Sequence, residues 1–216
     1  MRANRVLFMG TVVLTLGSLF LGAAGPAAAD SGIVDPAAAD SGIVDPEATD
    51  AEVVEADVVD TAVDYGGGCV LYSDNPSATI DSLRSHCSAE QQDAIFRDAP
   101  RGEVPRGVTN GWVTRPPIME VVAPALWIGK TFYTGPDGGF LVNRITQAGL
   151  EAWQADVYTA PAITDGGPTW ALNYAPSPTP QVYDEIREVT PNVWFGYSWW
   201  RGYFQTTLLL TFALTY

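Results

Sequence analysis

The clearest hydrophobic pattern of the chain lies at its C-terminal end. Over residues 208–215 two sets of side chains alternate, as in a β-strand with one face in a core. The first set is Leu208, Leu210, Phe212 and Leu214, and the second is Leu209, Thr211, Ala213 and Thr215. This run is about half of the roughly 20 residues that cross a bilayer as a helix, so it predicts a core strand.

Further segments rich in β-branched and aromatic residues, separated by turn residues, precede this strand. The expected strands are Val108–Thr114, Ile128–Thr134, Phe140–Thr146, Trp153–Tyr158, Thr169–Tyr174, Glu185–Val189, Val193–Trp200 and Phe204–Thr215, with a short helix at 117–126. Turn clusters at 135–139 and 165–167 are typical of antiparallel hairpins. Eight strands in simple succession predict a mainly β domain at 107–216, an antiparallel up-and-down β-barrel. A two-sheet β-sandwich is the alternative.

A short helical segment is expected before the barrel, in residues 67–106. Ser77 is suited to cap a helix over Thr79–His86, and Ser88 begins a capping-box pattern for a second helix toward Arg97. We expect this segment to be structural.

The first 29 residues have the features of a secretory signal peptide. Arginines precede an apolar run at 6–21, and Ala27–Ala29 offers small residues for cleavage. The sequence PAAADSGIVD then occurs twice in succession, from Pro26 to Asp45. We expect residues 30–66 to be a disordered acidic repeat spacer. The predicted location is secreted or associated with the cell envelope, with no stable membrane span after signal cleavage.

The negative charge of the chain excludes some classes of binding partner. Its net charge is −14 at pH 7, and the predicted signal peptide contains two of the eleven basic residues. Phosphate backbones and anionic membrane surfaces repel so acidic a protein, so we expect no nucleic-acid partner. The composition leaves the oligomeric state open.

Two cysteines, Cys69 and Cys87, predict one disulfide in an oxidising compartment. Its loop of about 19 residues would contribute on the order of 3 kcal/mol in the chain-entropy model. With one histidine and no C-x-x-C motif, we expect neither a metal site nor a cofactor.

Several short motifs resemble those of a known group of proteins. They are Trp127–Phe132 (WIGKTF), Asn143–Ile145 (NRI), Leu172–Tyr174 (LNY) and Asp184–Val189 (DEIREV), followed by Pro191 and Gly196. Over about residues 100–216 the chain resembles a little-characterised bacterial family of single-domain, lipocalin-like β-barrel proteins. The resemblance implies a barrel and no particular activity. Where a true lipocalin would carry G-x-W, this chain has Asn110-Gly111-Trp112, so the lipocalin likeness concerns architecture only.

An eight-stranded barrel is either filled by its own side chains or wide enough for one small ligand. A period of two places Glu185 and Arg187 on one face of their strand, with Asp184 on the other. Arg144 and Lys130 also share a strand face with apolar neighbours. If they point inward, Arg144, Arg187 and Glu185 are the expected polar anchors of a small apolar or amphipathic ligand. The alternative is that they form cross-strand pairs on the solvent face.

The expected apolar wall of the ligand site consists of aromatic residues. These are Trp127, Trp170, Tyr174 and Trp194. The most favoured function is therefore a secreted small-molecule-binding protein.

Two other functions remain open. Exposed rings around Trp199 and Trp200 would suit a carbohydrate- or cell-surface-binding module. A carboxylate pair would suit a small cofactor-free lyase or isomerase, although no spacing selects such a pair. Ser198 lies in G-Y-S-W-W, which lacks the last glycine of the G-x-S-x-G nucleophile motif, and His86 precedes it. We therefore assign no catalytic residues.

Overall fold

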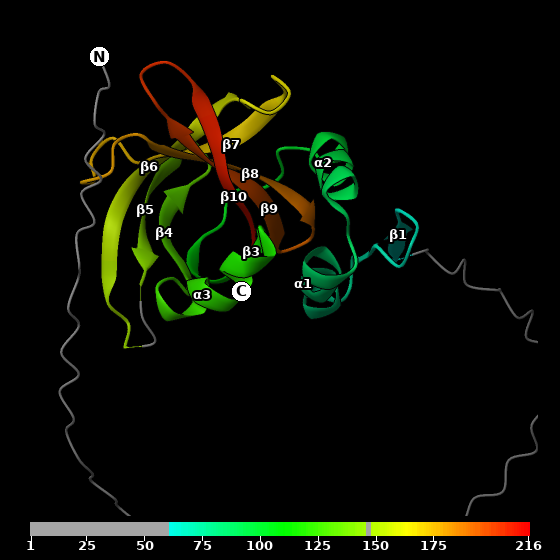
Figure 1. Ribbon diagram of the computed structural model, residues 1–216. Helices are drawn as coiled ribbons and strands as arrows, with labels where there is room; N and C mark the ends of the chain where they lie inside the picture. The colour runs from blue at the N-terminus through cyan, green and yellow to red at the C-terminus, as the bar shows by residue number, and fades with distance from the viewer. Residues whose placement is uncertain (1–60, 146–147) are drawn as a thin grey trace, which may run out of the picture. The chain divides into compact units, whose positions relative to one another are not determined.

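Eight antiparallel strands close into a β-barrel in the computed structural model, which describes residues 61–145 and 148–216. The barrel order is β10-β3-β4-β5-β6-β7-β8-β9, so each strand pairs with its neighbours in sequence and β10 closes on β3 (Figure 1). The predicted up-and-down barrel is confirmed, and the β-sandwich alternative is wrong. The predicted signal peptide, and the spacer up to residue 60, lie outside the described residues.

The strands fall close to the predicted segments. They are β3 Gly107–Arg115, β4 Gly129–Gly135, β5 Gly138–Arg144, β6 Glu151–Pro161, β7 Pro168–Asn173, β8 Val182–Thr190, β9 Val193–Arg201 and β10 Thr206–Thr215. β6 is longer than expected. β10 begins two residues later than expected, because the β9–β10 connection occupies residues 202–205.

A helical layer precedes the barrel, as the sequence predicts. It contains α1 Pro76–Ser85 and α2 Ala89–Asp98, and a two-stranded sheet of β1 Ala62–Asp64 and β2 Val70–Tyr72 lies beside them. Ser88 and Gln91 form the expected capping box of α2. The first helix is capped by Asn75 and not by Ser77, because Pro76 occupies the first helical turn and Asn75 accepts from the Ala78 amide. Within the described residues the first regular element begins at Ala62, inside the range expected to be spacer.

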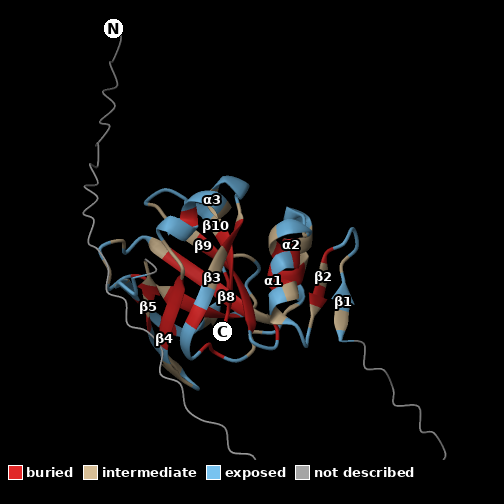
Figure 2. Ribbon diagram, turned by 90° about the horizontal axis from the view of Figure 1, so that it is seen from below, coloured by how far each residue is buried: buried red, intermediate tan, exposed pale blue. Residues whose placement is uncertain are grey.

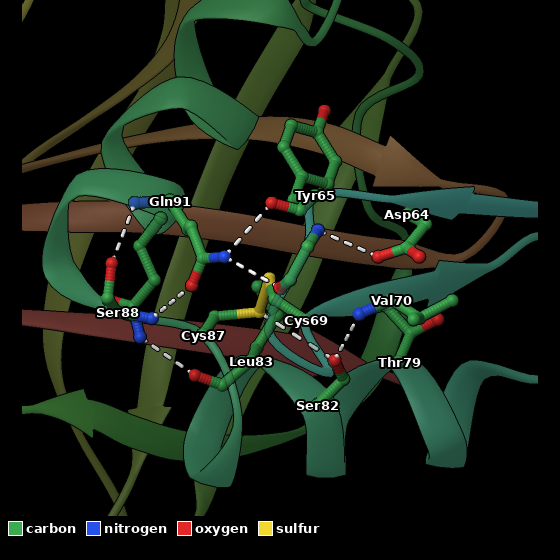
Figure 3. The surroundings of a disulfide bond; sticks show 12 residues. Asp64, Tyr65, Cys69, Val70, Thr79, Ser82, Leu83, Cys87, Ser88 and Gln91 are labelled. Carbon is green, nitrogen blue, oxygen red and sulfur yellow. Dashed lines mark hydrogen bonds between the residues drawn. A yellow bond between two sulfur atoms is a disulfide. The ribbon is translucent and has the colours of Figure 1, made fainter.

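The predicted disulfide joins Cys69 to Cys87 (Figure 3). Cys69 lies just before β2 and is fully buried, whereas Cys87 lies between the two helices. Beside the bridge, the Gln91 side chain donates to the Tyr65 and Gly66 carbonyls. The bond therefore ties the small sheet to the start of α2.

The helical layer covers the outer face of β9 and β10. One apolar cluster combines Leu83, Ile95 and Phe96 of the helices with Phe195 and Ala213 of the barrel. Both faces of β10 are consequently buried near its C-terminal end, as Figure 2 shows by the buried colouring of these strands. The expectation of a single core face on this strand is wrong there, because the helices bury the second face.

The barrel has a second apolar cluster in its interior. Its buried residues are Val104, Phe132, Leu141, Ala155, Val157, Trp170, Leu172, Tyr174, Ile186, Trp194, Phe212 and Leu214. At the end where β7 and β9 begin, the segment before β3 packs on the interior side chains, and its Val104 is buried among them. There Trp194 Nε1 donates to the Glu103 carbonyl at 2.7 Å and Trp170 Nε1 to the Gly102 carbonyl at 3.1 Å. This end of the barrel is therefore filled by its own side chains.

The opposite end is covered differently. The β3–β4 connection there forms α3 Pro117–Val122 and the 3₁₀ helix η1 Ala123–Ala125. No helix among the described residues is long and apolar enough to cross a membrane.

Candidate functional site

A cavity of about 230 Å³ lies inside the barrel beneath α3 and η1. Its lining is mostly apolar: Val113, Met119, Ala123, Leu126, Trp127, Trp153, Val182, Leu210 and Phe212, with Lys130, Asn143, Tyr174, Thr179, Asp184 and Ser198 as the polar members. These residues come from both covering helices and from all eight barrel strands or their ends. An apolar cavity with a few convergent polar groups is the usual form of a small-molecule site.

A buried ion pair lies at the centre of the polar members. Lys130 on β4 and Asp184 on β8 are 3.0 Å apart, Nζ to Oδ2, and both side chains are at most 5 % exposed. Lys130 is the only lysine in the chain. A lone buried charge costs several kcal/mol, so each member requires the other.

Neighbouring side chains complete the network around this pair. Lys130 Nζ also donates to Tyr174 Oη at 2.6 Å and to Asn143 Oδ1 at 3.0 Å. Asn143 Oδ1 also accepts from Trp127 Nε1 at 2.9 Å. The four strands or strand ends that supply these residues are thereby joined across the barrel interior.

Aromatic rings surround the ammonium group. Lys130 Nζ lies 5.1 Å from the Phe212 ring centroid and 5.3 Å from those of Trp127 and Tyr174. Such cation–π contacts are worth about 2 kcal/mol or more when desolvated. They replace part of the hydration that Lys130 loses on burial.

Burial changes the ionisation of this cluster. It lowers the pKa of Lys130, although the Asp184 carboxylate opposes that shift. Burial, together with Asp184, raises the pKa of Tyr174 well above its ordinary value of 10.0. Tyr174 is therefore a neutral phenol at physiological pH and can donate to Asp184 Oδ2, which lies 3.1 Å away.

A glycine on β3 makes room for the aromatic wall. Trp127 crosses over Gly111, where an added Cβ would lie 2.4 Å from Trp127 Cη2. The indole ring then meets Phe212 edge to face, with centroids 5.7 Å apart. Gly111 thus allows Trp127 to reach both the cavity and Asn143.

Two of the predicted wall residues, Trp127 and Tyr174, line the cavity. Trp170 and Trp194 are buried in the barrel interior but lie at its filled end, away from the cavity lining. They do not meet the first two because β7 and β9 run the length of the barrel, and residues near opposite strand ends are far apart.

The predicted polar anchors do not line the cavity. Arg187 binds Asp165 at 2.6 Å and donates to the Phe96 carbonyl of α2, and Glu185 accepts from the Ile163 and Thr164 amides. Arg144 donates to the Thr109 carbonyl and to Asn110. The inward placement on which their role as ligand anchors was conditional is therefore wrong.

The error has a simple origin. The face of β8 that points inward is that of Asp184 and Ile186, so Glu185 and Arg187 face out, where a loop and α2 pair them. Sequence reasoning therefore missed Asp184 and Asn143, and it did not select Lys130. The available signal was that Lys130 and Asp184 each fall in the alternating series of apolar residues along their strand, as a residue that points into a core would.

The residues on which the carbohydrate and enzyme hypotheses depend lie partly outside the cavity. Trp199 stacks on Tyr197 on the outer face of β9, at 5.8 Å between centroids, and Trp200 is 39 % exposed. Asp184 is the one carboxylate among the described residues that line the cavity. In residues 61–145 and 148–216 no group of three or more His, Cys, Asp or Glu is placed to hold a metal ion.

Comparison with known proteins adds one match. No protein-family model and no curated protein matches the chain. A solved structure described as "Crystal structure of protein from Thermomonospora curvata" matches at 17 % identity, over 60 % of this chain and 87 % of that one, with a TM-score of 0.42. At that level the similarity supports no argument, and the resemblance to lipocalin-like bacterial proteins stays a prediction.

Proposed function

We propose that this is a secreted protein that binds one small, largely apolar molecule inside its barrel. The observation that carries the proposal is the cavity itself: one end of the barrel is filled, while the other retains about 230 Å³ beside a polar cluster. A purely structural barrel of this size would be expected to fill its interior, because protein cores are close-packed.

The size of the cavity indicates the size of its occupant. An apolar cavity of about 150 Å³ is known to hold benzene. By proportion this cavity accommodates roughly nine or ten non-hydrogen atoms. The occupant would pack against Trp127, Leu210 and Phe212, which supply aromatic and aliphatic surface.

The enzyme and carbohydrate alternatives receive less support. The lyase or isomerase hypothesis requires two inward carboxylates, whereas Asp184 alone among the described cavity residues has one. Trp199 packs on Tyr197 and is partly covered, so of these two tryptophans only Trp200, at 39 % exposed, offers ring surface to a sugar.

A matched pair of variants tests the proposal. Ala123→Phe introduces a ring at a buried position that lines the cavity, whereas Ala125→Phe introduces the same ring at an exposed position of the same 3₁₀ turn. Native mass spectrometry of the mildly purified wild-type protein should show an added mass that denaturation removes. We expect Ala123→Phe to lose this adduct and Ala125→Phe to retain it. Equal retention in both variants would place the ligand elsewhere, and a bare mass in the wild type would count against an internal ligand.

A further inference from the structure

The polar cluster of the cavity has almost no unused hydrogen-bonding capacity. The three Lys130 hydrogens go to Asn143, Tyr174 and Asp184. Both Asn143 Nδ2 hydrogens are also engaged, by the Trp153 carbonyl and Tyr174 Oη, at 3.1 and 3.0 Å. Lys130 and Asn143 therefore present no free donor to a ligand.

One acceptor is left over. Asp184 Oδ2 accepts from Lys130 and Tyr174, whereas Asp184 Oδ1 is buried and has no hydrogen-bond partner. Leaving a buried polar atom unpaired is destabilising, and more so when the atom is charged. The terminal torsion of Asp is soft, so a small rotation can turn Oδ1 toward the cavity while Oδ2 keeps its partners.

The charge of the cluster restricts what can bind that oxygen. Lys130 and Asp184 neutralise each other as a pair. A ligand carboxylate beside Asp184 would bring a second anion to the cluster without finding a free donor on Lys130 or Asn143, and a ligand ammonium would leave a net positive charge in an apolar site. Either ion would lose its hydration without compensation.

Resting on the function proposed above, we propose that the ligand carries a neutral hydroxyl or amide N–H group that donates to Asp184 Oδ1. The rest of the molecule lies against the rings of Trp127 and Phe212. The class is therefore small aromatic or aliphatic alcohols and amides, and it excludes fatty acids and amines.

A series of probes with the same ring tests the proposal on the intact protein. The probes are 2-phenylethanol, its isomer benzyl methyl ether, ethylbenzene and phenylacetate, with each Kd measured by calorimetry at pH 7. The alcohol donates a hydrogen bond, whereas the ether can only accept one. Because hydrogen bonds to charged groups are worth about 1.5–3 kcal/mol, we expect the alcohol to bind about tenfold or more tightly than the ether. Phenylacetate should bind most weakly.

The outcomes separate this inference from the proposed function. Equal affinity for alcohol and ether, or tighter binding of phenylacetate, would overturn the donor assignment and leave the binding function intact. Failure of all four probes, ethylbenzene included, would count against the cavity as a binding site.

An amide in place of the carboxylate provides a second test. In Asp184→Asn, Lys130 and Tyr174 require the amide oxygen, so the free position becomes a donor. We expect the preference for alcohol over ether to disappear in this variant. The control Asp156→Asn makes the same change at an exposed position of β6 and should keep the preference. A preference that persists in a folded Asp184→Asn protein would overturn the proposal, and the wild-type series decides if that variant does not fold.

Discussion

At the residue scale, the cavity is built around the buried ammonium group of Lys130. Lys130 is 2 % exposed and has three oxygen partners and three aromatic neighbours. Buried ion pairs gain little over apolar residues of the same shape, but losing one partner is costly. The presence of this charged network is thus better explained by a role in the cavity than by a gain in the stability of the fold.

Replacing the lysine by an apolar residue of similar length should reveal this asymmetry. We expect Lys130→Met to lower the free energy of unfolding by about 3 kcal/mol or more, because Asp184 would remain buried without its cation. The double variant Lys130→Met/Asp184→Leu should recover most of that loss. Urea unfolding followed by tryptophan fluorescence measures both. A double variant as unstable as the single one would mean that the ion pair itself is strongly stabilising.

How far the sequence predicts the site is also decided at this scale. Trp127 and Tyr174 could be found from their residue type, because large aromatic residues favour the interior, and they lie just before β4 and just after β7. Asp184 could not, since Asp184 and Glu185 are adjacent and a shift of one residue exchanges the two faces of a strand. Both faces of β8 are buried, the inward face by the barrel interior and the outward face by α2. The residue pattern of β8 therefore does not distinguish the two faces.

At the scale of elements, the helical layer is held to the barrel by charged groups as well as by apolar contacts. Arg187 of β8 donates to the Phe96 carbonyl at 2.7 Å, and its guanidinium lies 4.4 Å from the Phe96 ring centroid. Asp93 of α2 accepts from Tyr197 at 2.6 Å and pairs with Arg115. Arg187 of β8, Tyr197 of β9 and Arg115 of β3 therefore help to hold α2 against the barrel.

The Arg187–Asp165 pair should make stability sensitive to acid. Burial by itself would raise the pKa of Asp165, but hydrogen bonds from Arg187 and from the Gly167 amide hold that pKa below 3.8. A depressed carboxyl pKa contributes stability that is present above the unfolded value and is lost as the pH falls through the folded value. We expect Asp165→Asn to unfold more easily than the wild type at pH 7, because it lacks the ion pair. Between about pH 5 and pH 2, where the wild-type carboxylate takes up its proton, the variant should lose less stability than the wild type.

Equilibrium urea unfolding at a series of pH values checks this prediction. Asp137→Asn, at an exposed turn carboxylate between β4 and β5, is the control and should follow the wild-type profile. If the Asp165→Asn profile also followed it, the ion pair would have no part in acid unfolding.

The disulfide should stabilise the layer that contains it. The two cysteines are 18 residues apart, a loop for which the chain-entropy model gives about 3 kcal/mol. We expect the Cys69→Ala/Cys87→Ala variant to lose roughly this much free energy of unfolding, with part of the loss from the cavity left at Cys69. Urea unfolding measures it, and an unchanged midpoint would show that the helices and β9 hold the layer without the bond.

At the scale of the whole molecule, the topology follows from signals that are local in sequence. Each hairpin pairs neighbouring strands, so turn clusters such as 135–139 and alternating strands suffice to predict an up-and-down barrel. The cavity could not be predicted in this way. It results from long-range packing, with Gly102 and Glu103 receiving the indoles of Trp170 and Trp194 at one end, and from α3 and η1 covering the other.

The most direct test of the account is a crystal structure of the protein in complex with 2-phenylethanol. We predict the phenyl ring between Trp127, Leu210 and Phe212, with the hydroxyl oxygen about 2.7 Å from Asp184 Oδ1. The Lys130–Asp184 pair should remain in place. An interior closed by the side chains of its own cavity lining, with the alcohol absent or bound only on the outer surface, would contradict the account.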